Sequence, residues 1–347
     1  MAQNDVLVEV KGLKTHFFTD EGVVKAVDGV DLNIYKGKML CIVGESGCGK
    51  SITARSILQL IDKPGRIVEG DILYHKAGGG VVNIAKLHPH SPEVRKIRGN
   101  DIAMIFQEPM SSLSPVYTIG NQITEGILLH QEVGKQEARD QAIECLRRVG
   151  IPKPEERMDA YPFQLSGGMR QRAMIAMALV CEPKLLIADE PTTALDVTTQ
   201  AQILDLILEL QEDMDMAVMF ITHDLGVVAE IAHDVSVMYL GNVVEFGDVD
   251  AIFHDPKHPY TQALLRSIPK MGLGEQVRLD TIEGMVPHPF NRPEGCPFHP
   301  RCEQKMAGIC DVYVPEREEP SPGRQVRCLL YSDLEKLRTT AKQGGVA

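Results

Sequence analysis

The chain lacks a long apolar run. In its 347 residues no stretch approaches the roughly 18–20 apolar residues that a membrane span needs. Its N-terminus has no basic stretch followed by an apolar segment, so no secretory signal is visible. Positive charge is also scarce: the net charge of −12 argues against a nucleic-acid binder with a broad basic face. These absences predict a soluble, cytoplasmic protein that reaches a membrane only through a partner.

A glycine-rich loop is the first motif that carries chemistry. It follows an apolar run, Met39–Val43, which we expect to be a buried strand, and precedes a helical pattern over residues 52–58. Its pattern, GxxxxGKS, is that of a phosphate-binding loop, in which backbone N–H groups and a helix N-terminus converge on phosphate oxygens. Lys50 should reach the β- and γ-phosphates of ATP, and the Ser51 hydroxyl should ligate Mg²⁺. The candidate nucleotide-binding residues here are Gly44, Glu45, Ser46, Gly47, Cys48, Gly49, Lys50, Ser51 and Ile52.

Cys48 is an unusual residue for this loop. It lies between two glycines, at the expected helix N-terminus and beside Lys50. We expect its thiol to be partly acidified and reactive there, although a buried thiol would be inert.

A second apolar run, Lys184–Glu190, ends in two carboxylates. Continuous apolar runs are typical of strands buried on both faces, as in parallel sheets. Such a strand delivers Asp189 and Glu190 to the carboxyl edge of the sheet, where phosphates bind. Asp189 suits a role at Mg²⁺, and Glu190 suits polarising the attacking water as a general base.

The segment Leu165–Gln171, with the sequence LSGGMRQ, precedes a helical pattern that runs from Met169 to Val180. This segment resembles the signature sequence of ATP-binding cassette (ABC) ATPases, which small GTPases, kinases and RecA-like motors lack. The resemblance covers about residues 6–265. It implies an α/β fold, the P-loop NTPase core of ABC type with an inserted helical subdomain. It also implies that two chains close on ATP, with the signature of one chain on the γ-phosphate held by the other. The signature residues concerned are Ser166, Gly167, Gly168 and Gln171.

The same resemblance assigns further residues. Gln107 matches the glutamine that touches metal and water, Asp196 the aspartate that couples two ATP sites, and His223 the histidine that contacts the γ-phosphate. Phe17 matches the aromatic residue that stacks on adenine, with Phe18 as its rival, because both cannot face the same side of a strand. The expected catalytic residues are Glu190, His223 and Gln107, and the expected Mg²⁺ ligands are Ser51, Gln107 and Asp189.

The motif map predicts two domains. Residues 1–265 would form the ABC ATPase domain, including a helical subdomain over residues 108–165. In that subdomain apolar residues recur in threes and fours, as at Ile119, Ile123, Ile127 and Leu128. From Pro269 onward proline and glycine increase and periodicity weakens, so residues 266–347 would form an irregular C-terminal extension.

Four of the eight cysteines cluster in that extension: Cys296, Cys302, Cys310 and Cys328. In a cytosolic chain such clustering indicates metal binding rather than disulfides. No C-x-x-C pair is present, and the spacing alone leaves a 4Fe–4S cluster, zinc and unligated thiols equally open. The segment is rich in proline and poor in periodic apolar residues, so it lacks the material for a core of its own. We therefore expect it to need a bound metal group in order to fold.

The extension, with Cys296–Cys302 and the upstream His258–Tyr260, resembles that of oligopeptide/dipeptide importer ATPases, more the D-type subunit than its F-type sister. That resemblance implies a 4Fe–4S cluster on the four cysteines, with zinc as the runner-up. It further implies a homologous F-type ATPase partner, two membrane permeases, indirectly a periplasmic or extracellular solute-binding protein, no nucleic acid, and a peripheral location at the cytoplasmic face of the membrane. Importers of glutathione, nickel or oligosaccharides remain alternatives, and a soluble ABC ATPase without a transport role is a more distant one.

Overall fold

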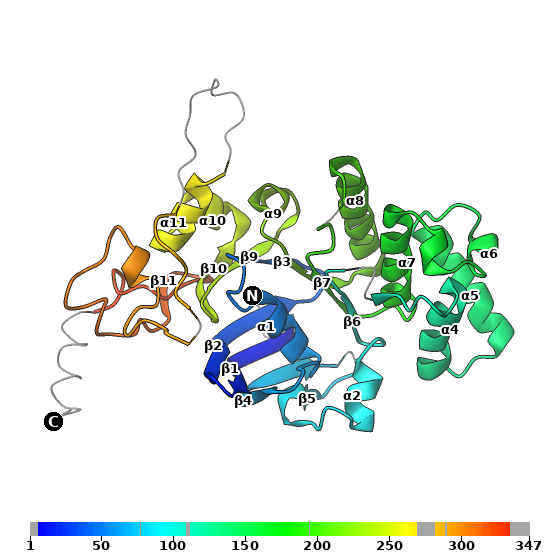
Figure 1. Ribbon diagram of the computed structural model, residues 1–347, viewed down its shortest axis with the longest axis horizontal. Helices are drawn as coiled ribbons and strands as arrows, with labels where there is room; N and C mark the ends of the chain where they lie inside the picture. Colours follow the sequence, from blue (N-terminus) through cyan, green and yellow to red (C-terminus); the bar gives the residue numbers. More distant parts are fainter. Residues whose placement is uncertain are drawn as a thin grey trace, which may run out of the picture.

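The computed structural model describes residues 6–76, 78–108, 112–193, 195–268, 282–288 and 290–333. Within them the chain forms two sheets, one of four strands and one of eight. Figure 1 shows the smaller sheet, in blue and cyan, below the larger one, with a helical segment in green at one end and the C-terminal part in orange and red at the other. Residues 1–5, 269–281 and 334–347 of the two expected domains lie outside the described residues, so the domain boundaries stay a prediction.

The larger sheet is parallel in its centre. Its strands are β3 (Met39–Val43), β6 (Ile102–Ile105), β7 (Leu185–Asp189), β8 (Ala217–Ile221), β9 (Asp234–Tyr239), β10 (Asn242–Asp248), β11 (Glu318–Ser321) and β12 (Arg324–Val326). Their order is β11-β12-β10-β9-β3-β8-β7-β6. The strands from β9 to β6 in this order run parallel, and β10, β12 and β11 extend one edge in antiparallel pairing. Parallel neighbours need long crossover connections, and helices supply them here.

Helices follow most of these strands. They are α1 (Lys50–Ile57), α2 (Pro92–Ile97), α4 (Ile119–His130), α5 (Lys135–Arg148), α6 (Pro154–Arg157), α7 (Gly167–Leu179), α8 (Val197–Met214), α9 (Leu225–Ile231), α10 (Val249–His254) and α11 (Pro259–Arg266). Short 3₁₀ helices cover Ile84–Lys86, Pro162–Gln164 and His299–Arg301. Within the described ranges, no helix is both long enough and apolar enough to cross a membrane.

The smaller sheet is antiparallel and is built from β1 (Val6–Thr19), β2 (Gly22–Tyr35), β4 (Gly65–His75) and β5 (Val81–Asn83), in the order β2-β1-β4-β5. A glycine-containing turn joins β4 to β5, and His75 pairs with Val81 across it. This sheet and the larger one share an apolar core. Ala54 and Ile57 of α1 also belong to this core.

Strand β3 shows why its run of residues is apolar throughout. Leu40 and Ile42 pack into the core shared with the smaller sheet, whereas Met39, Cys41 and Val43 pack into the core on the opposite face. Successive side chains of a strand point to opposite faces, so a strand covered on both sides needs apolar residues at every position. The same requirement explains β7 and β8, every residue of which is buried.

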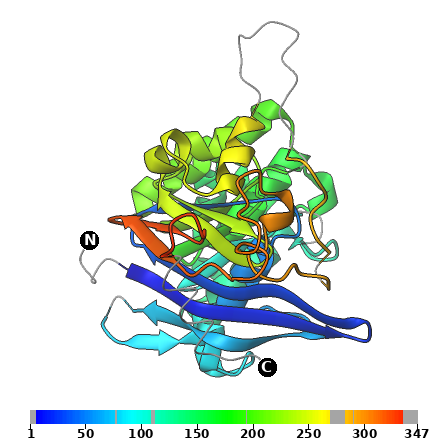
Figure 2. The ribbon, with the colours of Figure 1, turned by 90° about the vertical axis from the view of Figure 1, so that its left-hand side faces the viewer.

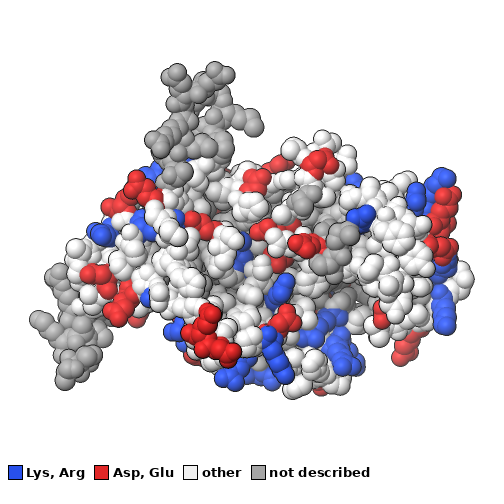
Figure 3. Space-filling model, viewed as in Figure 1, with Lys and Arg blue, Asp and Glu red and all other residues white. Residues whose placement is uncertain are grey.

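Helices α4, α5 and α6 form the helical segment at one end of the molecule. Ile119, Ile123 and Ile127 of α4 are buried, as the periodicity predicts, but Leu128 is 42% exposed. Leu128 lies one position beyond the i, i+4 stripe and therefore points away from the packed face. Ion pairs such as Arg139–Asp159 line the outer side of the segment, and Figure 3 shows acidic and basic side chains alternating at this end.

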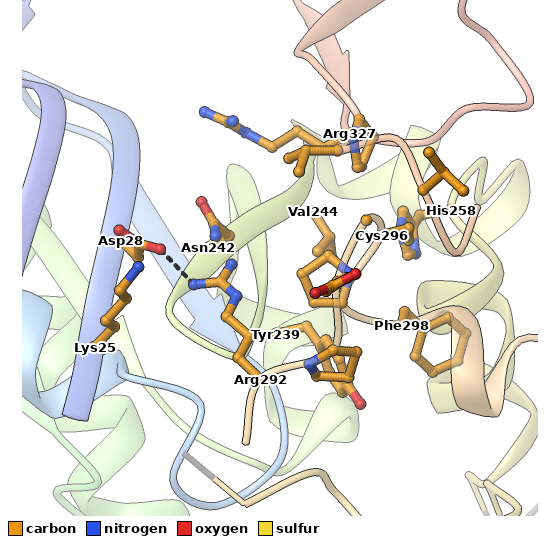
Figure 4. Close-up of a pocket in the computed structure, with 17 residues that line it drawn as sticks. Lys25, Asp28, Tyr239, Asn242, Val244, His258, Arg292, Cys296, Phe298 and Arg327 are labelled. Atoms are coloured by element: carbon orange, nitrogen blue, oxygen red, sulfur yellow. Dashed lines mark hydrogen bonds and ion pairs between the residues drawn. The ribbon is translucent and has the colours of Figure 1, made fainter. Parts of the chain in front are cut away.

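The C-terminal part packs on the rest of the chain through salt bridges. Arg292 contacts Asp28 of β2 at 2.6 Å, and Arg327 contacts Asp31 of the same strand at 2.9 Å. Figure 2 shows this part lying above the long β1–β2 hairpin. A cavity of about 560 Å³ lies at the junction, and Figure 4 shows Arg292 reaching across to Asp28 at its edge.

Candidate nucleotide-binding and catalytic site

The loop between β3 and α1 needs glycine at two positions. Gly44 has a φ of 148°, and a Cβ there would lie 2.2 Å from the carbonyl oxygen of Met238. Gly49 has a φ of 102°, and its Cβ would lie 2.3 Å from the carbonyl oxygen of Ala26. Both the left-handed backbone and the close backbone neighbours exclude a side chain. The loop therefore packs closely between β2 on one side and β9 with the β9–β10 turn on the other.

Helix α1 begins at this loop with an uncapped N-terminus. Its N-cap, Gly49, has no side chain to bind the first N–H groups, so these are left for an anion. Lys50 is 6% exposed, and its Nζ donates to the carbonyl oxygens of Gly44 and Glu45 at 2.7 and 3.2 Å. Its ammonium group thus folds back over the loop, in reach of where phosphates would bind.

Cys48 does not have the reactive thiol that its sequence position suggests. Its side chain is buried, at 2% exposure, and burial raises the pKa of the thiol. The Lys50 ammonium, 3.9 Å from the sulfur, offsets this effect only in part. The expectation of a partly acidified thiol is wrong, because desolvation penalises the thiolate more than one nearby cation favours it.

Ser51 and Asp189 meet at the first turn of α1. The Ser51 hydroxyl donates to Oδ1 of Asp189 at 2.9 Å. Asp189 is 2% exposed, and burial raises the pKa of its carboxyl group, with the Ser51 hydrogen bond acting in the opposite sense. A buried carboxylate beside a hydroxyl at a phosphate loop is a set of hard oxygen donors, which Mg²⁺ prefers.

Glu190 lies at the centre of a polar cluster. Its Oε2 accepts hydrogen bonds from Nε2 of Gln107 and from the hydroxyl of Thr193, both at 3.0 Å. Nδ1 of His223 lies 3.6 Å from its Oε1. Glu190 has a φ of 48°, an uncommon conformation for a residue with a side chain, and its N–H donates to the carbonyl oxygen of Ile221. Three residues thus fix the orientation of one half-buried carboxylate.

Sheet topology explains why residues so far apart in the chain converge. The phosphate loop, His223, Glu190 and Gln107 follow β3, β8, β7 and β6, which are consecutive neighbours in the sheet. These strands are parallel, so their carboxyl ends share one edge. Ligands of open α/β sheets bind at this edge.

The signature segment caps α7. The Ser166 hydroxyl accepts a hydrogen bond from the N–H of Met169 at 3.3 Å, and both Ser166 and Gly167 are exposed. Gln171 is buried and donates from Nε2 to the carbonyl oxygen of Pro191 at 2.5 Å, which ties α7 to the segment after Glu190. Ser166 is the N-cap of α7, and Figure 1 shows α7 on the far side of β7 and β6 from α1.

Asp196 caps the next helix. Its Oδ1 accepts from the N–H of Thr199 at 2.9 Å and its Oδ2 from the Thr199 hydroxyl at 2.8 Å. These hydrogen bonds lower the pKa of the Asp196 carboxyl group. The side chain is exposed, at the same end of α8 that approaches Gly168: a Cβ on Gly168 would lie 3.0 Å from the methyl group of Thr199. Asp196 and the signature thus belong to one surface.

Phe17 and Phe18 differ in what covers them. A Cβ on Gly65 would lie 2.6 Å from the ring of Phe17, so this half-buried ring packs against a bare backbone. Phe18 is 39% exposed, and the guanidinium of Arg66 lies 4.3 Å from the centre of its ring. The assignment of Phe17 to adenine stays a prediction.

We expect Phe17→Ala to weaken ATP binding by about tenfold, because stacking on a base contributes about 1–3 kcal/mol. Phe18→Ala is the matched control and should bind ATP like the wild type. Equilibrium titration with a fluorescent ATP analogue measures the effect, and thermal melts check that both variants fold. Wild-type affinity in a folded Phe17→Ala variant, with loss in Phe18→Ala, would reverse the assignment.

The four clustered cysteines do not form a metal site. Over the described residues, no group of three or more His, Cys, Asp or Glu residues is arranged to hold a metal ion. The predicted 4Fe–4S cluster on Cys296, Cys302, Cys310 and Cys328 is therefore wrong, and so is zinc as its alternative.

Burial gives the physical reason. Cys296, Cys310 and Cys328 are buried as free thiols, and burial raises the pKa of Cys296 to about 11 and that of Cys328 to about 12. Thiols with such pKa values are protonated at neutral pH, and a metal would have to displace their protons in order to bind. The extension also does not depend on a bound metal for its core, because Cys296 and Cys310 pack with Phe298 and Leu329 in the main core.

Two contacting residues of this region were not singled out from the sequence. The Thr193 hydroxyl donates to Glu190. Because Thr193 follows Glu190 by only three residues, the sequence alone could have indicated this contact. Arg301 contacts Glu45 of the phosphate loop at 2.7 Å, although the two residues are 256 positions apart in the sequence. No local sequence pattern predicts such a pair.

Comparison with known proteins agrees with this geometry. A family model described as "ABC transporter" matches residues 27–193, and one described as "Oligopeptide/dipeptide transporter, C-terminal region" matches residues 244–310. The chain is 50% identical to the oligopeptide transport ATP-binding protein AppD of Bacillus subtilis, over 94% of this chain and 97% of that protein. It is 48% identical to the dipeptide transport ATP-binding protein DppD of Escherichia coli, over 93% of this chain and 96% of that protein.

Among solved structures, a dimeric ATP-binding cassette in a post-hydrolysis state, bound to ADP and Pi, matches with a TM-score of 0.61 and 28% identity. The match covers 70% of this chain and 99% of that one. The fold is thus that of an ABC-type P-loop ATPase with mixed α/β sheets. Since its relatives match it along nearly their whole length at about half identity, the chain belongs to the ABC transporter family, among the ATP-binding proteins of oligopeptide and dipeptide transporters.

Proposed function

We propose that this chain hydrolyses ATP to drive the uptake of di- or oligopeptides through a membrane transporter. The observation that carries the proposal is the Glu190 cluster beside the phosphate loop. One half-buried carboxylate accepts hydrogen bonds from Gln107 and Thr193 and lies next to His223, at the sheet edge where α1 begins. A carboxylate oriented in this way can orient and deprotonate an attacking water. The names of the relatives support peptides as the solute.

The phosphate loop would bind the ATP phosphates. The free N–H groups at the start of α1 meet phosphate oxygens, and Lys50 turns from the loop carbonyls towards the β- and γ-phosphates. Phosphoryl transfer needs mostly positioning and charge neutralisation. Lys50 would supply charge on one side of the γ-phosphate and His223 a hydrogen-bond donor on the other.

Mg²⁺ fits the donors present. The Ser51 hydroxyl and the Asp189 carboxylate are 2.9 Å apart and both are hard oxygen donors, with Gln107 near Glu190 as a further amide ligand. An ion held by these residues would supply positive charge that neutralises charge developing on the phosphate oxygens. Such a site takes most of its ligands from the nucleotide and water, unlike the closed cysteine site excluded above.

Hydrolysis would require two chains. Ser166 and Gly167 are exposed at the start of α7, and Figure 1 shows α7 on the far side of β7 and β6 from α1, so we expect them to act on a nucleotide bound by a partner. We propose a homologous ATPase of the F type as this partner, with Asp196 at the shared surface. The solved dimeric cassette supports pairing of this kind.

Transport would couple through the helical segment. Large apolar side chains are exposed on this segment and on the residues that flank it: Leu129 of α4 at 73%, Val116 before α4 at 70% and Phe163 after α6 at 65%. Importer ATPases work with membrane permeases, and two such subunits would cover these residues and place the chain peripherally at the cytoplasmic face. A separate solute-binding protein would deliver the peptide.

Uptake of a radiolabelled dipeptide by membrane vesicles tests the function. Vesicles that contain the chain, its genomically neighbouring permeases and ATPase, and the binding protein should accumulate the label only with internal ATP. Accumulation of glutathione, nickel or an oligosaccharide instead would support an importer ATPase but identify a different solute. ATP hydrolysis without any accumulation would favour an ABC ATPase that serves no transporter.

We expect Asp189→Asn to stabilise the fold while it abolishes Mg²⁺-dependent turnover. Burial raises the folded-state pKa of Asp189 above its unfolded value, so the charged carboxylate opposes folding at neutral pH. This penalty is present above the folded-state pKa and is relieved as the pH falls through it. The neutral amide should therefore raise Tm at pH 7.5 by about 2–4 °C, and by less as the pH falls through the folded-state pKa of Asp189.

Asp234→Asn is the matched control, because burial also raises the pKa of Asp234, which lies at the start of β9 away from the site. That variant should keep its ATPase activity. Differential scanning fluorimetry and phosphate release are the readouts. A lower Tm for Asp189→Asn, or full turnover, would contradict the assignment.

A further inference from the structure

We propose that Arg301 of the C-terminal part is a positioning residue for nucleotide binding, acting through Glu45 of the phosphate loop. The inference rests on the proposed ATPase function and adds to it a residue outside the motifs of ATP chemistry. The Arg301 guanidinium binds the Glu45 carboxylate through two parallel hydrogen bonds, Nη1 to Oε2 at 2.7 Å and Nη2 to Oε1 at 3.0 Å. Two-pronged pairs of this kind fix geometry as well as charge.

The pair is shielded from water. The side chain of Arg301 is 4% exposed and that of Glu45 is 25% exposed. The Glu45 carboxylate, as the principal cause, raises the pKa of Arg301, so the guanidinium remains charged. An ion pair with little solvent around it is poorly screened, and removal of one partner leaves the other charge uncompensated.

Aromatic packing sets the position of Arg301. The Tyr239 hydroxyl lies 3.5 Å from Nη1, and the Tyr239 ring centre lies 5.9 Å from the guanidinium carbon. Phe298, three residues before Arg301, packs edge-on against Tyr239 at 5.2 Å and against Tyr260 at 5.3 Å. Figure 4 shows Tyr239 and Phe298 near each other in the wall of the junction.

The backbone of Glu45 is held from the same side. Its N–H donates to the Tyr260 hydroxyl at 2.9 Å, and its carbonyl oxygen accepts from Nζ of Lys50 at 3.2 Å. Arg301 of the C-terminal part and Tyr260 of α11 therefore contact the side chain and the backbone of the same loop residue. That residue in turn contacts the lysine that would bind phosphate.

Charge explains why this contact should matter for nucleotide affinity. Glu45 is an acidic residue in a loop that binds a polyphosphate, and a free carboxylate there would repel the ligand. Arg301 neutralises it and directs it away from the N–H groups of the loop. Without Arg301 the uncompensated carboxylate should disfavour nucleotide binding, and it should do so less at high salt.

The test is a charge cycle on the full chain with a fluorescent ATP analogue. We expect Arg301→Gln to raise the Kd about tenfold at low salt, with a smaller rise at 0.5 M salt. Glu45→Gln in the same background should restore the Kd to within about threefold of wild type, because no charge is left unpaired. A merely structural role for Arg301 would not produce rescue by removal of its partner.

Arg327→Gln is the matched control. It removes an extension arginine from an ion pair with Asp31 of β2 at 2.9 Å, away from the phosphate loop, and should leave the Kd unchanged. If Arg301→Gln fails to fold, Glu45→Gln alone keeps the inference testable: the Arg301 guanidinium is then uncompensated beside the phosphates and should lower the Kd at low salt, and less so at 0.5 M salt. An unchanged or higher Kd in this variant would contradict the inference. Three results would overturn the inference. They are a wild-type Kd in folded Arg301→Gln, a rise of the Kd in Arg327→Gln as large as in Arg301→Gln, and a Kd in the double variant no lower than in Arg301→Gln. Failure of the wild-type chain to bind the analogue would instead overturn the proposed function.

Discussion

Replacement of Glu190 by Gln should lower ATP turnover by about 10²–10⁴-fold, the range for loss of a positioned base. Nucleotide binding should stay near wild type. The amide can still accept the hydrogen bonds of Gln107 and Thr193, so the cluster keeps its geometry, but it cannot take a proton from water. Phosphate release by the assembled importer measures turnover, and equilibrium titration measures binding.

Glu209→Gln is the control for this change. It removes an exposed carboxylate of α8 and should leave turnover unaltered. Turnover near the wild-type rate in Glu190→Gln would remove Glu190 as the base. Equal loss of binding and turnover would show that the carboxylate contributes to nucleotide binding rather than to the chemical step.

Substitution of Gly167 by Asp should abolish hydrolysis, by more than about 100-fold, without damage to the monomer. A Cβ at Gly167 meets no atom within 4 Å, so the fold has room for the new side chain. An acidic residue at the start of α7 even favours the helix, by about 0.3–1 kcal/mol. In the dimer, however, it would place a negative charge against the γ-phosphate of the partner's nucleotide.

The separation of stability from activity makes this variant informative. Gly167→Asp should melt at or above the wild-type temperature, bind one nucleotide per chain, and fail to dimerise with ATP in size-exclusion chromatography. Gly167→Ala adds bulk without charge and should retain much of the activity. Dimerisation and hydrolysis by Gly167→Asp would mean that this segment does not face a partner's phosphate.

Local sequence was sufficient where each element carries its own pattern. The run Met39–Val43 predicted β3, and the buried stripe of Ile119, Ile123 and Ile127 predicted α4, because the periods of side-chain burial are properties of the elements themselves. Leu128 marks the limit of such reasoning. Periodicity gives the face of a helix, but which residues at its edge are covered depends on the neighbouring elements.

The cysteines show a second limit. Composition described the C-terminal segment as too poor in periodic apolar residues for a core of its own, and clustering then favoured a metal. The segment instead contributes Cys296, Phe298, Cys310 and Leu329 to the core of the whole chain. A residue list cannot show that a segment shares a core with another, and burial also raised the pKa of the Cys48, Cys296 and Cys328 thiols.

The sequence by itself determined the family, the phosphate loop and the carboxylates at the end of β7, because these motifs are contiguous and each needs particular residues at fixed spacing. Only the tertiary structure decided what surrounds them. It brought Gln107, Thr193 and His223 around Glu190, and it placed Arg301 on Glu45. Such contacts join residues from different strands and from the far end of the chain. They depend on how parallel strands order themselves in a sheet and on which surfaces pack together, and neither is encoded in a local pattern.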